Sequence, residues 1–135
     1  MWNTYSQFDW LKFLALAKEL RKRESEEEAI RTCVSRAYYA TYHKAVEFLD
    51  GRGISVSRAA AGPGGARATT THDAVWRAFS ESRDQRWQKI GENGDRLKRK
   101  RQWVDYDSHV PNLIPSVADE SLLYSERIIN ELSTL

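Results

Sequence analysis

The strongest constraint on the fold is the spacing of apolar residues, which recur every three to four positions along most of the chain. This period is typical of amphipathic helices, and the alternating pattern of a strand is nearly absent. The first such segment runs from Phe8 to Leu20 and is followed by three basic residues. The second follows Ser25 and Glu28, whose spacing is typical of a capping box, and is predicted to end near Leu49.

The second half of the chain contains three further helical segments. The first begins at Thr70 or Thr71 and extends toward Ile90, and Gly91 and Gly94 are expected to interrupt it. The next is a basic helix opened by Asp95, which ends before Pro111. Ser116 or Asp119 is expected to open the last helix.

Between the second and third segments, residues 50–71 are rich in glycine and other small residues. We predict a flexible loop there, because the helices on either side are too few to fold as separate domains. With 135 residues, the chain suits one domain. The prediction is therefore a single all-α domain over residues 1–135, an up-and-down bundle of four to five helices with a long Gly-rich loop between helices two and three.

The composition excludes several classes of protein. The formal net charge is only +2, so the balance of charge alone does not identify a nucleic-acid-binding protein. The single cysteine, Cys33, excludes an internal disulfide and a multi-cysteine zinc site, and we expect it in the core. No apolar run is long enough to span a membrane, and the N-terminus lacks the features of a secretory signal. We therefore expect a cytoplasmic protein that needs no membrane, no metal and no cofactor.

The most informative motif lies on the second helix, where residues 35–43 read SRAYYATYH. Successive residues turn by about 100° around a helix, so Arg36, Tyr39 and His43 fall on one side, opposite the apolar stripe. Arg36 and His43 are then about 10.5 Å apart along the axis, with Tyr39 between them. An imidazole can exchange a proton near neutral pH, and a guanidinium can stabilise charge on a phosphate. The alternative is a solvated polar face on which Arg36 pairs with Glu47 or with another helix.

The fourth segment carries five cations within six positions, from Arg96 to Arg101. Arg99, Lys100 and Arg101 are candidates for contacts with an RNA backbone, and the alternative is a solvated helix whose long side chains cover apolar neighbours. Arg101 and Asp105 can pair across one turn.

Two further histidines lie in different settings. His72 falls in the first turn of the third helix, where the helix dipole favours a neutral imidazole, and we expect it to cap the helix or anchor the loop. His109 is expected at the end of the basic helix because Pro111 prevents its continuation. The chain contains no paired-carboxylate site, no HExxH motif and no phosphate-binding glycine loop.

Three segments in this order resemble the HEPN superfamily, and in particular small bacterial HEPN proteins. They are SRAYYATYHKAVEFL at 35–49, THDAVWRAF at 71–79 and RKRQWVDY at 99–106. The resemblance implies an all-α bundle that forms homodimers. It also implies a metal-independent ribonuclease. Such ribonucleases of the family include toxins of toxin–antitoxin and phage-defence systems. The other function it implies is a non-catalytic partner of a nucleotidyltransferase, or a nucleotide-binding module.

Carried over to this chain, Arg36 and His43 match the family's R-x4–6-H signature. The second motif matches Arg101, Asp105 and Tyr106, with valine where alanine is usual. Arg101 and His109 form a second arginine–histidine pair, one residue longer than the signature, so either pair is a candidate for the catalytic one. The resemblance thus gives Arg36, Tyr39 and His43 catalytic roles. It implies supporting roles for His72, Asp105, Tyr106 and His109, with RNA, a second copy, and an antitoxin or nucleotidyltransferase as partners.

Overall fold

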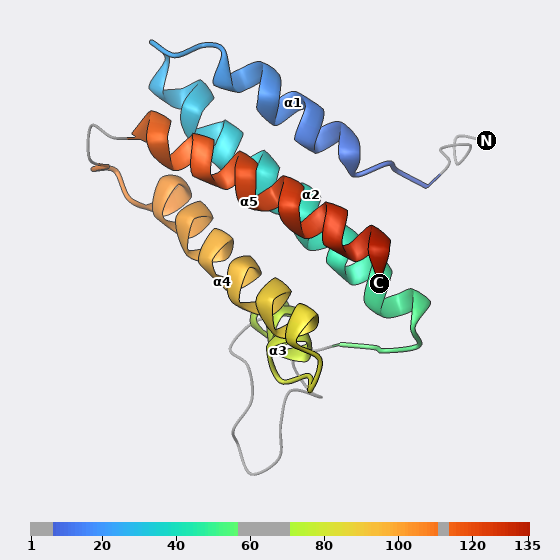
Figure 1. Ribbon diagram of the computed structural model, residues 1–135. Helices are drawn as coiled ribbons and strands as arrows, with labels where there is room; N and C mark the ends of the chain where they lie inside the picture. Colours follow the sequence, from blue (N-terminus) through green and yellow to red (C-terminus); the bar gives the residue numbers. More distant parts are fainter. Residues whose placement is uncertain (1–6, 57–70, 111–113) are drawn as a thin grey trace, which may run out of the picture.

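The computed structural model describes residues 7–56, 71–110 and 114–135, and the secondary structure of these residues is helical throughout (Figure 1). The prediction of an all-α fold with four to five helices is therefore confirmed. The helices are α1 (Leu11–Arg21), α2 (Glu27–Gly51), α3 (Thr71–Ser80), α4 (Gln85–Tyr106) and α5 (Ile114–Thr134). None of the helices in the described parts is both long enough and apolar enough to cross a lipid bilayer.

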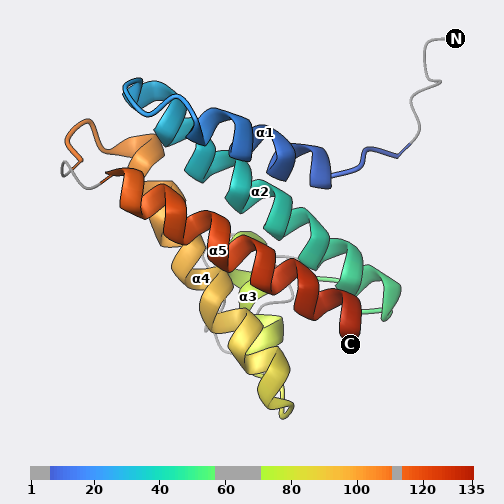
Figure 2. The same ribbon diagram turned by 45° about the horizontal axis from the view of Figure 1, so that its top comes forward.

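Helix α2 is the centre of the structure and contacts each of the other four helices. Helices α1 and α4 run in the direction opposite to α2 and α5 (Figures 1 and 2). The helices α2 and α5 therefore run in the same direction, and they lie side by side. The short α3 lies at one end, against the start of α4. Because neighbours surround α2, twelve of its 25 residues are buried.

The core has two parts, which meet along α2. In one part, rings such as Tyr38, Trp76 and Phe79 lie where α2, α3 and α4 converge. In the other part, small and branched residues of α2 pack against α1 and the start of α5. Small side chains bring α2 and α5 close together, and the hydroxyl of Ser125 donates a hydrogen bond to the carbonyl of Ala37 at 3.2 Å. Cys33 lies in this second part, as predicted, and burial raises the pKa of its thiol to about 11.

Three predicted boundaries differ from the structure at helix ends. The predicted capping box is wrong, because α2 is preceded by Glu26 and no side chain caps it. Helix α2 also continues through Gly51, two residues beyond the predicted end. Helix α5 begins at Ile114, before Ser116 and Asp119. Most of the predicted flexible loop, residues 57–70, lies outside the described residues.

The largest difference concerns Gly91 and Gly94, which do not interrupt a helix but lie inside α4. The chain turns earlier, between Ser80 and Gln85, where the side chain of Asp84 caps α4 by accepting a hydrogen bond from the backbone of Arg86. Both glycines face α3. A Cβ atom at Gly91 would overlap the backbone of α3, and one at Gly94 would overlap the indole of Trp76. They are therefore needed for the close approach of two helices.

This packing gives the first prediction. Gly94→Ala removes the space that the Trp76 indole occupies, so we expect a loss of about 1–3 kcal/mol in the free energy of unfolding. The expected sign is opposite to that of helix propensity alone, which favours alanine over glycine by about 1 kcal/mol. Chemical denaturation measures the change.

Gly51→Ala is the matched control, because a Cβ atom there has no atom within 4 Å. We expect no loss for this variant and a gain of up to about 1 kcal/mol from helix propensity. Equal stability of Gly94→Ala and the wild type would contradict the close packing of α3 on α4.

Candidate functional site

Two arginines lie against the ring of Tyr39, one from each of the two motifs. The Cζ atom of Arg36 in α2 is 5.1 Å from the centre of the Tyr39 ring, and that of Arg101 in α4 is 5.5 Å from it. Arg36 also lies over Phe13 of α1, at 4.7 Å. These distances are those of cation–π contacts. We call Arg36, Tyr39 and Arg101 the Tyr39 clamp.

Arg101 is buried, as in the predicted alternative in which long side chains of the basic helix cover apolar neighbours. Only 7% of its side chain is exposed, and its Cζ atom also lies 5.3 Å from the ring centre of Tyr38 and 5.7 Å from that of Tyr106. Its ion pair with Asp105 is long, at 3.9 Å. Its buried Nε atom has no hydrogen-bond acceptor within the described residues. A buried donor without an acceptor is costly, so the contacts with the tyrosine rings and the long pair with Asp105 must offset this cost.

A short chain of polar contacts joins the two motifs beside the clamp. The hydroxyl of Ser35 donates a hydrogen bond to the carboxylate of Asp105 at 3.3 Å. The same hydroxyl oxygen accepts one from the guanidinium of Arg36, also at 3.3 Å. Arg36 therefore does not form the alternative pair with Glu47, whose carboxylate pairs with Lys44 at 3.2 Å.

His43 lies one turn further along α2, and its ring stacks on Trp10, which immediately precedes α1. The ring centres are 3.6 Å apart and the planes differ by 11°. The histidine is half-buried, and its ring centre is 6.2 Å from that of Tyr39. Burial lowers the pKa of His43, Glu47 opposes the shift, and the nearby charge of Arg36 adds to it. The imidazole is therefore neutral at pH 7 and can accept a proton.

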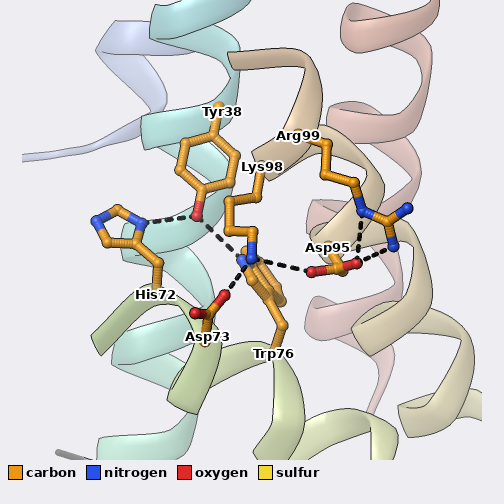
Figure 3. Close-up of polar contacts among 7 residues, drawn as sticks. All are labelled: Tyr38, His72, Asp73, Trp76, Asp95, Lys98 and Arg99. Carbon is orange, nitrogen blue, oxygen red and sulfur yellow. Dashed lines mark hydrogen bonds and ion pairs between the residues drawn. The ribbon is translucent and has the colours of Figure 1, made fainter. Parts of the chain in front are cut away.

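His72 contributes a second imidazole, which comes from the first turn of α3 (Figure 3). The indole of Trp76 donates a hydrogen bond to the Tyr38 hydroxyl at 3.0 Å, and that hydroxyl is 2.7 Å from Nδ1 of His72. The hydroxyl accepts from the indole and can donate its own proton to Nδ1, an arrangement in which the neutral His72 carries its proton on Nε2. The ring also stacks on Tyr42 at 4.1 Å. His72 is thus fixed by aromatic partners on α2.

The charge state of His72 follows from its surroundings. Burial is the main cause that lowers its pKa to about 4, and the positive charge of Arg101 is the second. His43 and Lys98 act in the same direction, and Asp73 opposes them. The neutral imidazole predicted for this position is therefore supported, but the main cause is burial rather than the helix dipole. The contact with Tyr38 could not be anticipated, because no sequence signal pairs α2 with the start of α3.

The remaining predicted residues lie around α4. Arg99 and Lys100 face away from the clamp and pair with Asp95 and Glu120 respectively. Lys98 points inward, between Asp73 and Asp95 (Figure 3).

Beyond the clamp, Tyr106 and Asp105 are exposed at the end of α4. His109 lies past this end, also exposed, and its backbone N–H donates to the side chain of Asp107. Of the two arginine–histidine pairs, it is Arg36 and His43 whose side chains both lie close to Tyr39.

Within residues 7–56, 71–110 and 114–135, no cluster of three or more histidine, cysteine, aspartate or glutamate side chains is arranged to hold a metal ion. No protein-family model matches the chain, and no curated protein matches it.

The state of His72 gives the second prediction. Its pKa is about 4 in the folded protein and about 6.5 in the unfolded chain. Between these values the unfolded chain binds more protons, so this histidine's contribution to stability is complete above pH 6.5 and is lost as the pH falls to 4. We expect His72→Asn, whose amide oxygen can accept the Tyr38 proton, to lose less stability over this range than the wild type. Urea denaturation at several pH values measures the difference, and parallel curves would contradict it.

Proposed function

We propose that this protein is a metal-independent endoribonuclease of the HEPN type. The observation that supports the proposal most is the pair of guanidiniums of Arg36 and Arg101 around Tyr39, with the neutral imidazole of His43 beside them. Two guanidiniums supply several donors for the non-bridging oxygens of a phosphodiester, and a neutral imidazole supplies a base. The reaction class that needs these groups and no redox chemistry is cleavage of RNA by its own 2′-hydroxyl.

In this mechanism His43 removes the proton of the 2′-hydroxyl, and the oxygen forms a bond to the adjacent phosphorus. The bond from phosphorus to the 5′-oxygen breaks, and this oxygen takes up a proton from the imidazolium or from water. The products are a 2′,3′-cyclic phosphate and a 5′-hydroxyl. Arg36 and Arg101 stabilise the charge on phosphorus-bound oxygens in the transition state, and Tyr39 keeps the guanidiniums apart and oriented. Trp10 stacks on one face of the His43 imidazole. The ring nitrogens lie at the edge of the imidazole, so this stacking does not block proton transfer.

Arg101 has a different role here from the backbone contact predicted for it. Its burial prevents it from following an extended RNA strand along the surface, and we infer that its guanidinium contacts a single phosphate group instead. We propose that Asp105 holds this guanidinium only loosely, at 3.9 Å, so that a phosphate oxygen can replace the carboxylate.

The third prediction tests the cleavage. Purified protein should cut a single-stranded RNA in the presence of EDTA and release ends with a 2′,3′-cyclic phosphate. His43→Asn and Arg36→Gln should each lower the rate at least about 100-fold, since a general base contributes that much or more. Gel analysis of end-labelled RNA measures the rate, and circular dichroism checks the helical content.

Arg23→Gln is the matched control, because Arg23 is exposed and belongs to neither arginine–histidine pair, and His109→Asn tests the second pair directly. They should cleave like the wild type. Loss of cleavage in His109→Asn with full activity in His43→Asn would move the catalytic role to the second arginine–histidine pair. Unchanged cleavage in both His43→Asn and Arg36→Gln would remove the proposal.

A non-catalytic role, as the partner of a nucleotidyltransferase or as a nucleotide-binding module, is the second candidate. The observation that favours it is the close stacking of Trp10 on His43, which gives this imidazole a packing role. Under this alternative the purified chain cuts no RNA in EDTA. Arg36→Gln then weakens the complex with the nucleotidyltransferase or the affinity for a nucleotide, as measured by calorimetry.

Homodimer formation and membership of a toxin–antitoxin or phage-defence system stay predictions, as does a cytoplasmic location. The exposed apolar residues of α1 and of the segment before it are a candidate dimer surface, and their substitution would test dimer formation. They are Phe8, Leu11 and Leu16.

A further inference from the structure

A second charged surface lies on the side of α4 away from the Tyr39 clamp. Arg96, Arg99, Lys100 and Trp103 line an open hollow of about 280 Å³. Their spacing of three, four and seven residues places them on one face of the helix. Arg101, by contrast, projects from α4 toward the rings of α2. We call this surface the α4 groove.

The α4 groove has more positive than negative charge. Arg96 donates a hydrogen bond to the hydroxyl of Tyr124 in α5 at 3.0 Å, and a neutral hydroxyl does not cancel its charge. Arg127 lies over the same tyrosine ring, at 5.7 Å. Of the carboxylates beside the groove, Glu120 pairs with Lys100, and Asp95 is shared between Arg99 and the inward-pointing Lys98.

Trp103 adds a flat apolar surface at one end of the row of cations. It is half-buried, so part of its ring is accessible in the hollow. An aromatic ring beside cations is the arrangement that binds single-stranded nucleic acids, where bases stack on the ring and phosphates contact the cations. In a duplex the base faces are covered by their neighbours, so a stacking site favours an unpaired strand.

We propose that the α4 groove binds a single-stranded segment of nucleic acid, with a base on Trp103 and the backbone along Arg96, Arg99 and Lys100. The proposal goes beyond RNA cleavage, because binding here needs neither His43 nor a free 2′-hydroxyl. The groove also differs from the predicted RNA contacts: it includes Arg96 and Trp103 and excludes Arg101, which belongs to the Tyr39 clamp.

The fourth prediction uses a fluorescein-labelled 2′-O-methyl oligoribonucleotide of 12 nucleotides, which lacks the hydroxyl needed for cleavage. Fluorescence anisotropy measures its dissociation constant at several salt concentrations. The double variant Arg96→Gln/Arg99→Gln should bind at least fivefold more weakly than the wild type. The slope of log K against log salt should also fall by about 1.4, since each phosphate contact on a single strand contributes about 0.7.

Arg23→Gln/Arg83→Gln is the matched control, because it removes the same charge from exposed positions outside the groove. This control should bind within twofold of the wild type. Equal losses in the two double variants would overturn the proposal, because they would show a general effect of net charge.

Trp103→Leu keeps an apolar side chain but removes the stacking surface, and it should weaken binding at least fivefold while the helical content stays unchanged. If this variant does not fold, the arginine variant and a duplex of the same sequence still decide the question. Duplex binding as tight as single-strand binding would overturn the proposal. Loss of binding in the groove variants with no cleavage of unmodified RNA by the wild type would support the groove and remove only the ribonuclease.

Discussion

The contact between Trp76 and the glycine face of α4 is the constraint on which the packing of α3 and the position of His72 depend. Because Gly94 has no side chain, the indole of Trp76 lies flat against α4 and α3 comes close to it. This position directs the indole N–H to the hydroxyl of Tyr38, which in turn fixes His72. A larger residue at position 94 would therefore change helix packing and, through Trp76 and Tyr38, the position of the His72 imidazole (Figure 3).

Periodicity predicted much of the fold, because a buried stripe leaves a direct trace in the sequence. The helical class and the sharing of one side of α2 by Arg36, Tyr39 and His43 follow from a turn of about 100° per residue. The role of Gly91 and Gly94 could not be predicted in this way. A glycine has the same local preferences whether it ends a helix or admits a neighbouring ring, and only the position of Trp76 distinguishes the two cases.

The basic run of α4 shows a second limit of sequence reasoning. Arg99, Lys100 and Arg101 are adjacent in the chain, yet Arg101 does not share the surface that Arg99 and Lys100 form. Arg99 remains 74% exposed, whereas Arg101 is buried among tyrosine rings. Only knowledge of the helices on each side of α4 separates an arginine that is buried among rings from one that stays exposed. One cationic segment thus supplies both the Tyr39 clamp and the α4 groove.

The electrostatics of the clamp link ligand binding to protonation. Burial lowers the pKa of both His43 and His72, and the charge of Arg36 or Arg101 adds to each shift. The positive charge in this region therefore resides on the guanidiniums, and the imidazoles are neutral. Under the proposed function, a phosphate that contacts Arg36 or Arg101 offsets these charges and raises both pKa values toward their ordinary range. An imidazole that starts as a base could then hold the proton it has taken and return it to a leaving oxygen, as cleavage of a phosphodiester requires.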